Sequence, residues 1–167
     1  MRGAVMSAER FDLFEPKIFS FPVDYEKTVE EMVFAGRYAQ KNENVVEKYF
    51  HIKKEKSVVL FEGRYFNYPR NISSREVEGE IEQEDRVNPW LPAQSEHILA
   101  FGAAFPDEQN ERRSIVGLGS KTMIEEICRV ICLRKTVASG RRLDLLHWNG
   151  DWTSLFYFLA VRPILAS

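Results

Sequence analysis

The sequence contains few cysteines, and their spacing excludes a disulfide within one strand. Among the 167 residues only Cys128 and Cys132 occur. On a strand, residues four apart have Cα atoms about 13 Å from each other, too far for a disulfide. Because there is no second Cys or His pair at ligand spacing, the thiols also form at best half a zinc site. We therefore expect free thiols, no metal and no cofactor.

Long apolar runs and a large net charge are absent as well. No stretch of about 18 uncharged apolar residues is present, and the first residues lack the apolar region of a signal peptide. These features predict no membrane span and a cytoplasmic location. A formal net charge of −2 provides no global attraction to nucleic acid or acidic lipid, so a charged partner has to be engaged locally.

Sequence signatures of catalysis and nucleotide binding are also lacking. There is no nucleophile motif, no Walker loop and no dinucleotide fingerprint, and residues 117–120 (Gly-Leu-Gly-Ser) carry only part of a Gly-rich phosphate loop. His51 and His97 are isolated, which is typical of surface or core histidines. These absences favour a protein that is not an enzyme.

The composition is that of one globular domain. Hydrophobic residues make up 44% and charged residues 29% of the chain, close to globular averages. Residues 11–22 are aromatic-rich and include Pro16 and Pro22, a pattern typical of an extended or edge segment. We expect an extended N-terminal arm over residues 1–22 and one α+β domain over residues 23–167. The 11–22 segment could close a monomer or mediate a homo-oligomer.

Helical signals occur mainly in the first two thirds of the chain. Apolar spacing, Asp24 as N-cap and Gly36 as a stop predict a helix at about 25–36, and a further turn of helix is expected at 43–49. Residues 74–85 alternate Glu with other residues like a strand, yet Ser73 and Glu76 form a capping box, so we predict a helix. The third helix is expected from Pro92 to about residue 105.

Strand signals occur mainly in the last third. The predicted strands are residues 57–61, 115–118, 129–133, 143–147 and 156–161. Asn149-Gly150 between apolar segments is a hairpin signal. The order predicts an α+β fold in which helices from the N-terminal two thirds pack on a mostly antiparallel sheet formed largely by the C-terminal third.

Five segments resemble a family of small uncharacterised bacterial proteins. They are residues 92–102, residues 106–109 (Pro-Asp-Glu-Gln), residues 114–120 (Ser-Ile-Val-Gly-Leu-Gly-Ser), residues 148–152 (Trp-Asn-Gly-Asp-Trp) and residues 158–162 (Phe-Leu-Ala-Val-Arg). The likeness extends over roughly residues 25–162. It implies no activity, because the family has none assigned.

The chain also departs from the family pattern at three positions. Leu91 and Tyr157 stand where basic residues are usual, and Ser114 stands where a proline is usual. The resemblance therefore assigns no role to these three positions. The layout is also similar to C-type-lectin-like domains at the level of fold, which does not imply function.

A first candidate site is the segment with His147, Trp148, Asp151 and Trp152. An imidazole, a carboxylate and two indoles in one turn could bind a ligand or perform acid–base chemistry. The alternative is structural, with the tryptophans covering the end of the sheet and Asp151 capping the turn.

A second candidate is a basic cluster without an acidic neighbour. Its members are Arg129, Arg134, Lys135, Arg141 and Arg142. On a hairpin at 129–142 they could track a nucleic-acid backbone, with Trp148 adding base stacking. The alternative is that these charges decorate a sheet edge and discourage aggregation.

The leading hypothesis is a non-enzymatic binding or accessory module of bacterial or mobile-element origin, with an unknown protein or nucleic-acid partner. The first alternative is a nucleic-acid-binding domain that uses the 129–142 hairpin. The second is an enzyme that uses His147 and Asp151, which requires both side chains to face one cleft.

Overall fold

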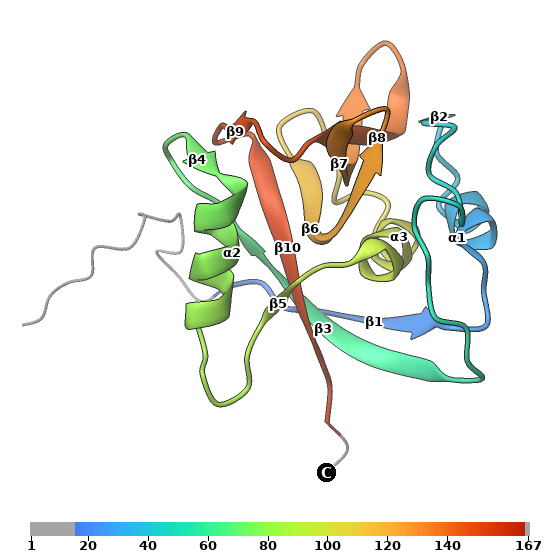
Figure 1. The fold of residues 1–167 in the computed structure, drawn as a ribbon, viewed down its shortest axis with the longest axis horizontal. Coiled ribbons are helices and arrows are strands. Elements are labelled where there is room, and N and C mark those ends of the chain that lie inside the picture. The colour runs from blue at the N-terminus through green and yellow to red at the C-terminus, as the bar shows by residue number, and fades with distance from the viewer. Residues whose placement is uncertain (1–15, 166–167) are drawn as a thin grey trace, which may run out of the picture.

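The computed structural model describes residues 16–165, in which three helices alternate with strands (Figure 1). The elements are β1 (Phe19–Asp24), α1 (Val29–Ala35), β2 (Gln40–Lys41), β3 (Val58–Phe66), β4 (Ile72–Ser73), α2 (Ser74–Gln83), β5 (Leu91–Pro92), α3 (Ser95–Ala104), β6 (Ser114–Ile124), β7 (Ile127–Thr136), β8 (Gly140–His147), β9 (Asp151–Trp152) and β10 (Phe156–Pro163). No helix within residues 16–165 is long and apolar enough to cross a membrane.

The main sheet is organised around β10. The strand order is β1-β3-β10-β6-β7-β8-β2, and β10 is antiparallel to β3 on one side. On its other side, β10 runs parallel to β6 at residues 156–158 and then antiparallel to β5 at residues 160–161. The last strand in sequence therefore lies inside the sheet.

The α+β class is as expected, but the prediction of a mostly antiparallel sheet from the C-terminal third is wrong. The sheet is mixed, because β10 pairs in parallel with β6 and β2 pairs in parallel with β8. Strands β1 and β3 come from the first part of the chain and continue the sheet beyond β10. The helices are therefore interleaved with strands and are not clearly N-terminal.

Apolar side chains cover both faces of the sheet. Helices α1 and α3 lie on one face, where Phe19, Phe21, Phe101 and Phe105 pack as edge-to-face or tilted ring pairs. Helix α2 covers the other face, as Figure 1 shows, and buries a separate cluster that includes Trp152.

The helix boundaries follow capping chemistry. The capping box of Ser73 and Glu76 is present at the start of α2, which confirms the helix predicted there. Helix α1 begins after Thr28, which forms its own capping box with Glu31, while Asp24 accepts a hydrogen bond from the Glu26 N–H in the preceding turn. Residues 43–49 form turns and no helix.

Two further expectations are corrected at the ends of elements. Pro92 belongs to β5, so α3 begins only after Gln94. Asn149-Gly150 does not close a hairpin, because the strand that follows it, β9, pairs with β4 in a separate small sheet. The expected hairpin at 129–142 is present as β7 and β8, and Gly140 adopts a φ of 69° at its turn.

The expected arm over residues 1–22 is described only from residue 16. Residues 1–15 lie outside the described residues. Phe19 and Phe21 of β1 are buried in the core on the α3 face, and the expected boundary after residue 22 falls within this strand.

The β6–β7 hairpin has a turn that is unfavourable for its residues. Glu125 and Glu126 connect the paired residues Ile124 and Ile127, with φ values of 51° and 67°. A two-residue turn with both φ angles positive favours Asn and Gly, because other L-residues are strained there.

We expect the double substitution Glu125→Asn plus Glu126→Gly to raise the free energy of unfolding by about 1 kcal/mol, because it relieves this backbone strain. Urea unfolding of the purified protein measures the change. The control is Glu125→Gln plus Glu126→Gln, which removes both charges and keeps the strain. Equal stabilisation by the two variants would mean that charge repulsion, and not the backbone, is the cause.

Candidate functional site

The tryptophan segment is divided between the interior and the surface. Trp152 is 3% exposed, and its Nε1–H donates to Ser74 Oγ at 2.8 Å. Ser74 in turn donates to the Trp148 carbonyl at 2.6 Å, which ties the start of α2 to the end of β8. Trp152 therefore belongs to the core under α2.

Of the other members of this segment, only Trp148 packs against the core cluster that contains Trp152. His147 and Asp151 are exposed, and Trp148 is half-buried beneath Lys121, whose Nζ lies 4.1 Å from the ring centroid. His147 pairs with Arg129 across β7 and β8, whereas Asp151 lies in the small sheet with β4. The two residues thus belong to different sheets.

The basic residues of the hairpin lie on both of its faces. Arg134 pairs with Arg142, and the next pair along the ladder is Lys135 with Arg141. Because consecutive positions of a strand point to opposite faces, these two pairs are separated by the hairpin itself. Arg129 is roughly 17 Å further along β7. The hairpin therefore presents no single basic surface.

Asp144 balances part of this charge. Its carboxylate accepts from Arg142 at 3.2 Å and lies 3.7 Å from Arg134. Asp144 follows Arg142 by two residues, and the ladder places it opposite Cys132, the next position on the same face of the hairpin as the Arg134–Arg142 pair. Because Asp144 neutralises part of the positive charge, the cluster attracts a phosphate group less strongly.

Arg141 is directed inward and connects the ends of two helices. Its guanidinium donates to the carbonyl of Gly36, at the end of α1, and to the carbonyl of Gly102, in the last turn of α3, at 2.9 Å in the second case. It also donates to Gln109 Oε1 at 2.9 Å. A cation is favourable at the C-terminus of a helix, and here one side chain serves two helices.

Tyr38 fills the space between the same two helix ends. The Arg141 guanidinium carbon lies 4.7 Å from its ring centroid. A Cβ at Gly102 would collide with the Tyr38 hydroxyl, so this approach requires glycine. Burial raises the pKa of Tyr38 to about 12, against the opposing effect of Arg141.

The glycine-rich segment at 117–120 supports the start of α3. A Cβ at Gly119 would lie 2.5 Å from the Pro92 carbonyl oxygen, and the Gly119 N–H donates to the Ala93 carbonyl at 2.8 Å. Ser120 Oγ accepts from the Ser95 N–H at 2.8 Å, in the first turn of α3. These residues pack β6 against the chain that enters α3.

His97 is a neutral core residue. It is 6% exposed, its Nδ1 accepts from the Gln94 N–H at 2.9 Å, and its ring lies 4.4 Å from that of Phe61. Burial lowers its pKa to about 4. Burial also raises the pKa of the neighbouring Glu96, whose Oε2 lies 3.5 Å from the Tyr25 hydroxyl. In the described residues no three His, Cys, Asp or Glu side chains are grouped to hold a metal.

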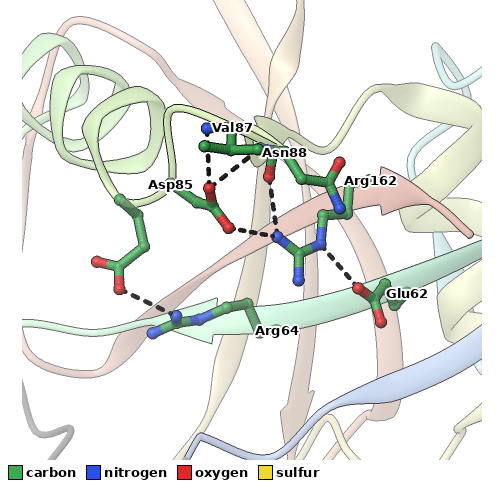
Figure 2. A network of polar contacts seen from close by, with 7 residues as sticks. Glu62, Arg64, Asp85, Val87, Asn88 and Arg162 are labelled. Atoms are coloured by element: carbon green, nitrogen blue, oxygen red, sulfur yellow. Dashed lines mark hydrogen bonds and ion pairs between the residues drawn. The ribbon is translucent and has the colours of Figure 1, made fainter.

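Arg162 connects β10 to the loop after α2 (Figure 2). It donates to Glu62 at 2.7 Å, to Asp85 at 3.2 Å and to the Asn88 carbonyl at 2.9 Å. Its guanidinium lies 4.0 Å from the Trp90 ring centroid. The Arg162 that closes the Phe-Leu-Ala-Val-Arg segment thus has a structural use.

A concave feature of the described residues is a groove between α1, α3 and β1. It has a volume of about 270 Å³. The lining is mostly apolar and consists of Pro22, Asp24, Lys27, Met32, Ala35, Leu99, Ala100, Ala103 and Ala104. Alanines at 100, 103 and 104 leave the space open because none reaches across to α1. The sequence gives little signal for this groove, since alanine is common in any helix.

A shallower hollow adjoins the groove across α1. It is lined by Glu30, Glu31 and Phe34 and shares Lys27 and Ala35 with the groove. Phe34 is 80% exposed, which is unusual for so large an apolar side chain. Groove and hollow together give α1 an apolar surface bordered by carboxylates.

Comparison of the chain with known protein families, curated proteins and solved structures finds no match. The function is therefore argued from this geometry.

We expect Arg141→Lys to lower the free energy of unfolding by about 2–3 kcal/mol, because an ammonium cannot span three acceptors arranged for a guanidinium. Urea unfolding measures the loss. Arg142→Lys is the matched control, since the Arg142 side chain is 35% exposed and pairs with the carboxylate of Asp144 alone, and it should cost under about 1 kcal/mol. Equal losses in the two variants would contradict the bridging role of Arg141.

We expect the His97 environment to make folding sensitive to acid. Because the folded state lowers the pKa of His97, its contribution is complete above the unfolded pKa of about 6.5 and is lost as the pH falls toward 4. Between pH 7 and pH 5 the wild type should lose about 2 kcal/mol relative to His97→Asn, which keeps an acceptor for Gln94. Glu96 acts in the opposite direction and is present in both proteins. Parallel pH profiles of unfolding would contradict this assignment.

Proposed function

We propose that this protein is a non-enzymatic binding module that takes up an apolar side chain of a partner protein in the groove between α1 and α3. The observation that carries the proposal is the alanine-lined groove beside the exposed Phe34. An apolar patch that stays exposed on a globular domain and is rimmed by polar residues commonly marks an interaction site.

The size of the groove favours a protein partner. Pockets for small molecules usually enclose roughly 300–1,000 Å³ and bury most of the ligand. A volume of about 270 Å³ lies just below this range and suits one or two side chains projecting from another chain. Its lining offers Asp24 and Lys27 at one end and otherwise alkyl groups, which supports binding more than chemistry.

The two alternative functions receive less support. A nucleic-acid interface at 129–142 loses Arg141 to the helix ends and shares Arg134 and Arg142 with Asp144. An enzyme using His147 and Asp151 needs both in one cleft, and the strands that carry them lie in different sheets.

We expect Ala103→Leu to weaken partner binding at least about tenfold, because the added carbons occupy the groove. Peptides selected from a displayed random library on the wild type should share a large apolar residue, and their dissociation constants for both proteins measure the effect. Ala138→Leu, the same change at the exposed β7–β8 turn, is the matched control and should bind like the wild type. Equal binding by wild type and Ala103→Leu would overturn the groove as the site.

A further inference from the structure

Strand β1 forms an edge of the main sheet, and two hydrogen bonds define which of its residues face outward. The Tyr25 N–H donates to the Ser57 carbonyl at 2.9 Å, just beyond the β1–β3 ladder. The Ile164 N–H donates to the Leu60 carbonyl at 2.9 Å, so the backbone of Leu60 faces β10 and not β1. Hydrogen-bonded and non-bonded residue pairs alternate along an antiparallel ladder. Both bonds therefore indicate that the backbone N–H and C=O groups of the even-numbered residues of β1 point away from β3.

The residues of β1 whose backbone groups face away from β3 are Ser20, Pro22 and Asp24. No other strand pairs with this edge in the part of the chain that the structure describes. Pro22 agrees with this arrangement, because its missing N–H removes no bond to β3. Pro22 and Asp24 also line the groove. The free strand edge and the groove are therefore parts of one surface.

The charges at one end of this surface have predominantly one sign. The charged residues that line the groove and the hollow are Asp24, Glu30 and Glu31 against the single cation Lys27. Glu26 lies further out, where Lys54 and Lys56 accompany it. The hydrogen bond from the Thr28 N–H holds the pKa of Glu31 below its usual value. An acidic border of this kind complements a basic segment and repels an acidic one.

We propose that the occupant is an extended, basic segment of a partner protein that adds to β1 as a strand and places an apolar side chain in the groove. This inference rests on the proposed function and names the form and charge of the partner. Main-chain bonds to Ser20 and to the Pro22 carbonyl would provide affinity, and the groove would provide side-chain specificity, as in other cases of strand addition.

The probe is a short synthetic peptide with capped ends in which Val-Leu-Val is flanked by two lysines on each side. Its counterpart carries glutamates in place of the lysines. We expect the lysine peptide to bind at least about tenfold more tightly than the glutamate peptide, and this difference should shrink at high salt. Titration calorimetry on the full chain measures both.

Two changes test the backbone pairing. Ser20→Pro removes a main-chain donor that faces away from β3 and should weaken the lysine peptide about fivefold or more, whereas Ser20→Ala should not. The second test does not depend on protein folding. The backbone amides of the peptide are N-methylated one at a time, and only every second methylation should weaken binding, because alternate amides of a strand face the strand that it joins.

The outcomes separate this inference from the proposed function. If both peptides bind equally and N-methylation has no period of two, while Ala103→Leu still abolishes binding, strand addition is overturned and the groove remains the site. If neither peptide binds, the inference is overturned. If the free protein forms a dimer that Ser20→Pro dissociates, the occupant of the edge is a second copy of this chain, which also overturns the inference.

Discussion

The arrangement of helices α1 and α3 depends on one partly buried guanidinium. Arg141 extends from β8 to the carbonyls of Gly36 and Gly102, so a single side chain sets the distance between the end of α1 and the last turn of α3. Gln109 holds that guanidinium from the third side and itself donates to the carbonyls of Arg134 and Arg142. The width of the groove follows, because α1 and α3 are its walls.

Local signals in the sequence predicted helix α2 correctly, but they misplaced the starts of α1 and α3 and predicted a hairpin at Asn149-Gly150 that does not form. The capping box of Ser73 and Glu76 correctly outweighed the alternating glutamates of α2, because it satisfies backbone donors that a strand would leave to a neighbour. Strand pairing between distant segments had no such signal. Strands β2, β4, β5 and β9 are two residues long, too short to show a period, and the parallel contact of β10 with β6 depends on a crossover that no local pattern records.

The prediction of site residues from the sequence was limited by the same absence of long-range information. Composition indicated where charge and aromatic rings are concentrated, but not which of them face inward. Arg141 and Arg142 are adjacent in sequence, yet one bridges two helix ends and the other forms a partly buried ion pair with Asp144. Trp152 lies in the core because α2, far away in sequence, covers it through Ser74. The sequence did not predict the groove, because the groove forms where alanines have side chains too short to fill the space between α1 and α3.

The distribution of charge in the fold gives a reason to look for a basic partner. Arg141 and Arg162 bind backbone carbonyls and carboxylates within the domain, and Arg64 is 5% exposed beside Glu84. These three guanidinium groups are thus paired within the domain. The carboxylates of Glu26, Glu30 and Glu31, before and within α1, remain at the surface. A chain with a net charge of only −2 thereby acquires a local acidic border beside an apolar groove, and local fields of this kind select partners even where the overall charge is small.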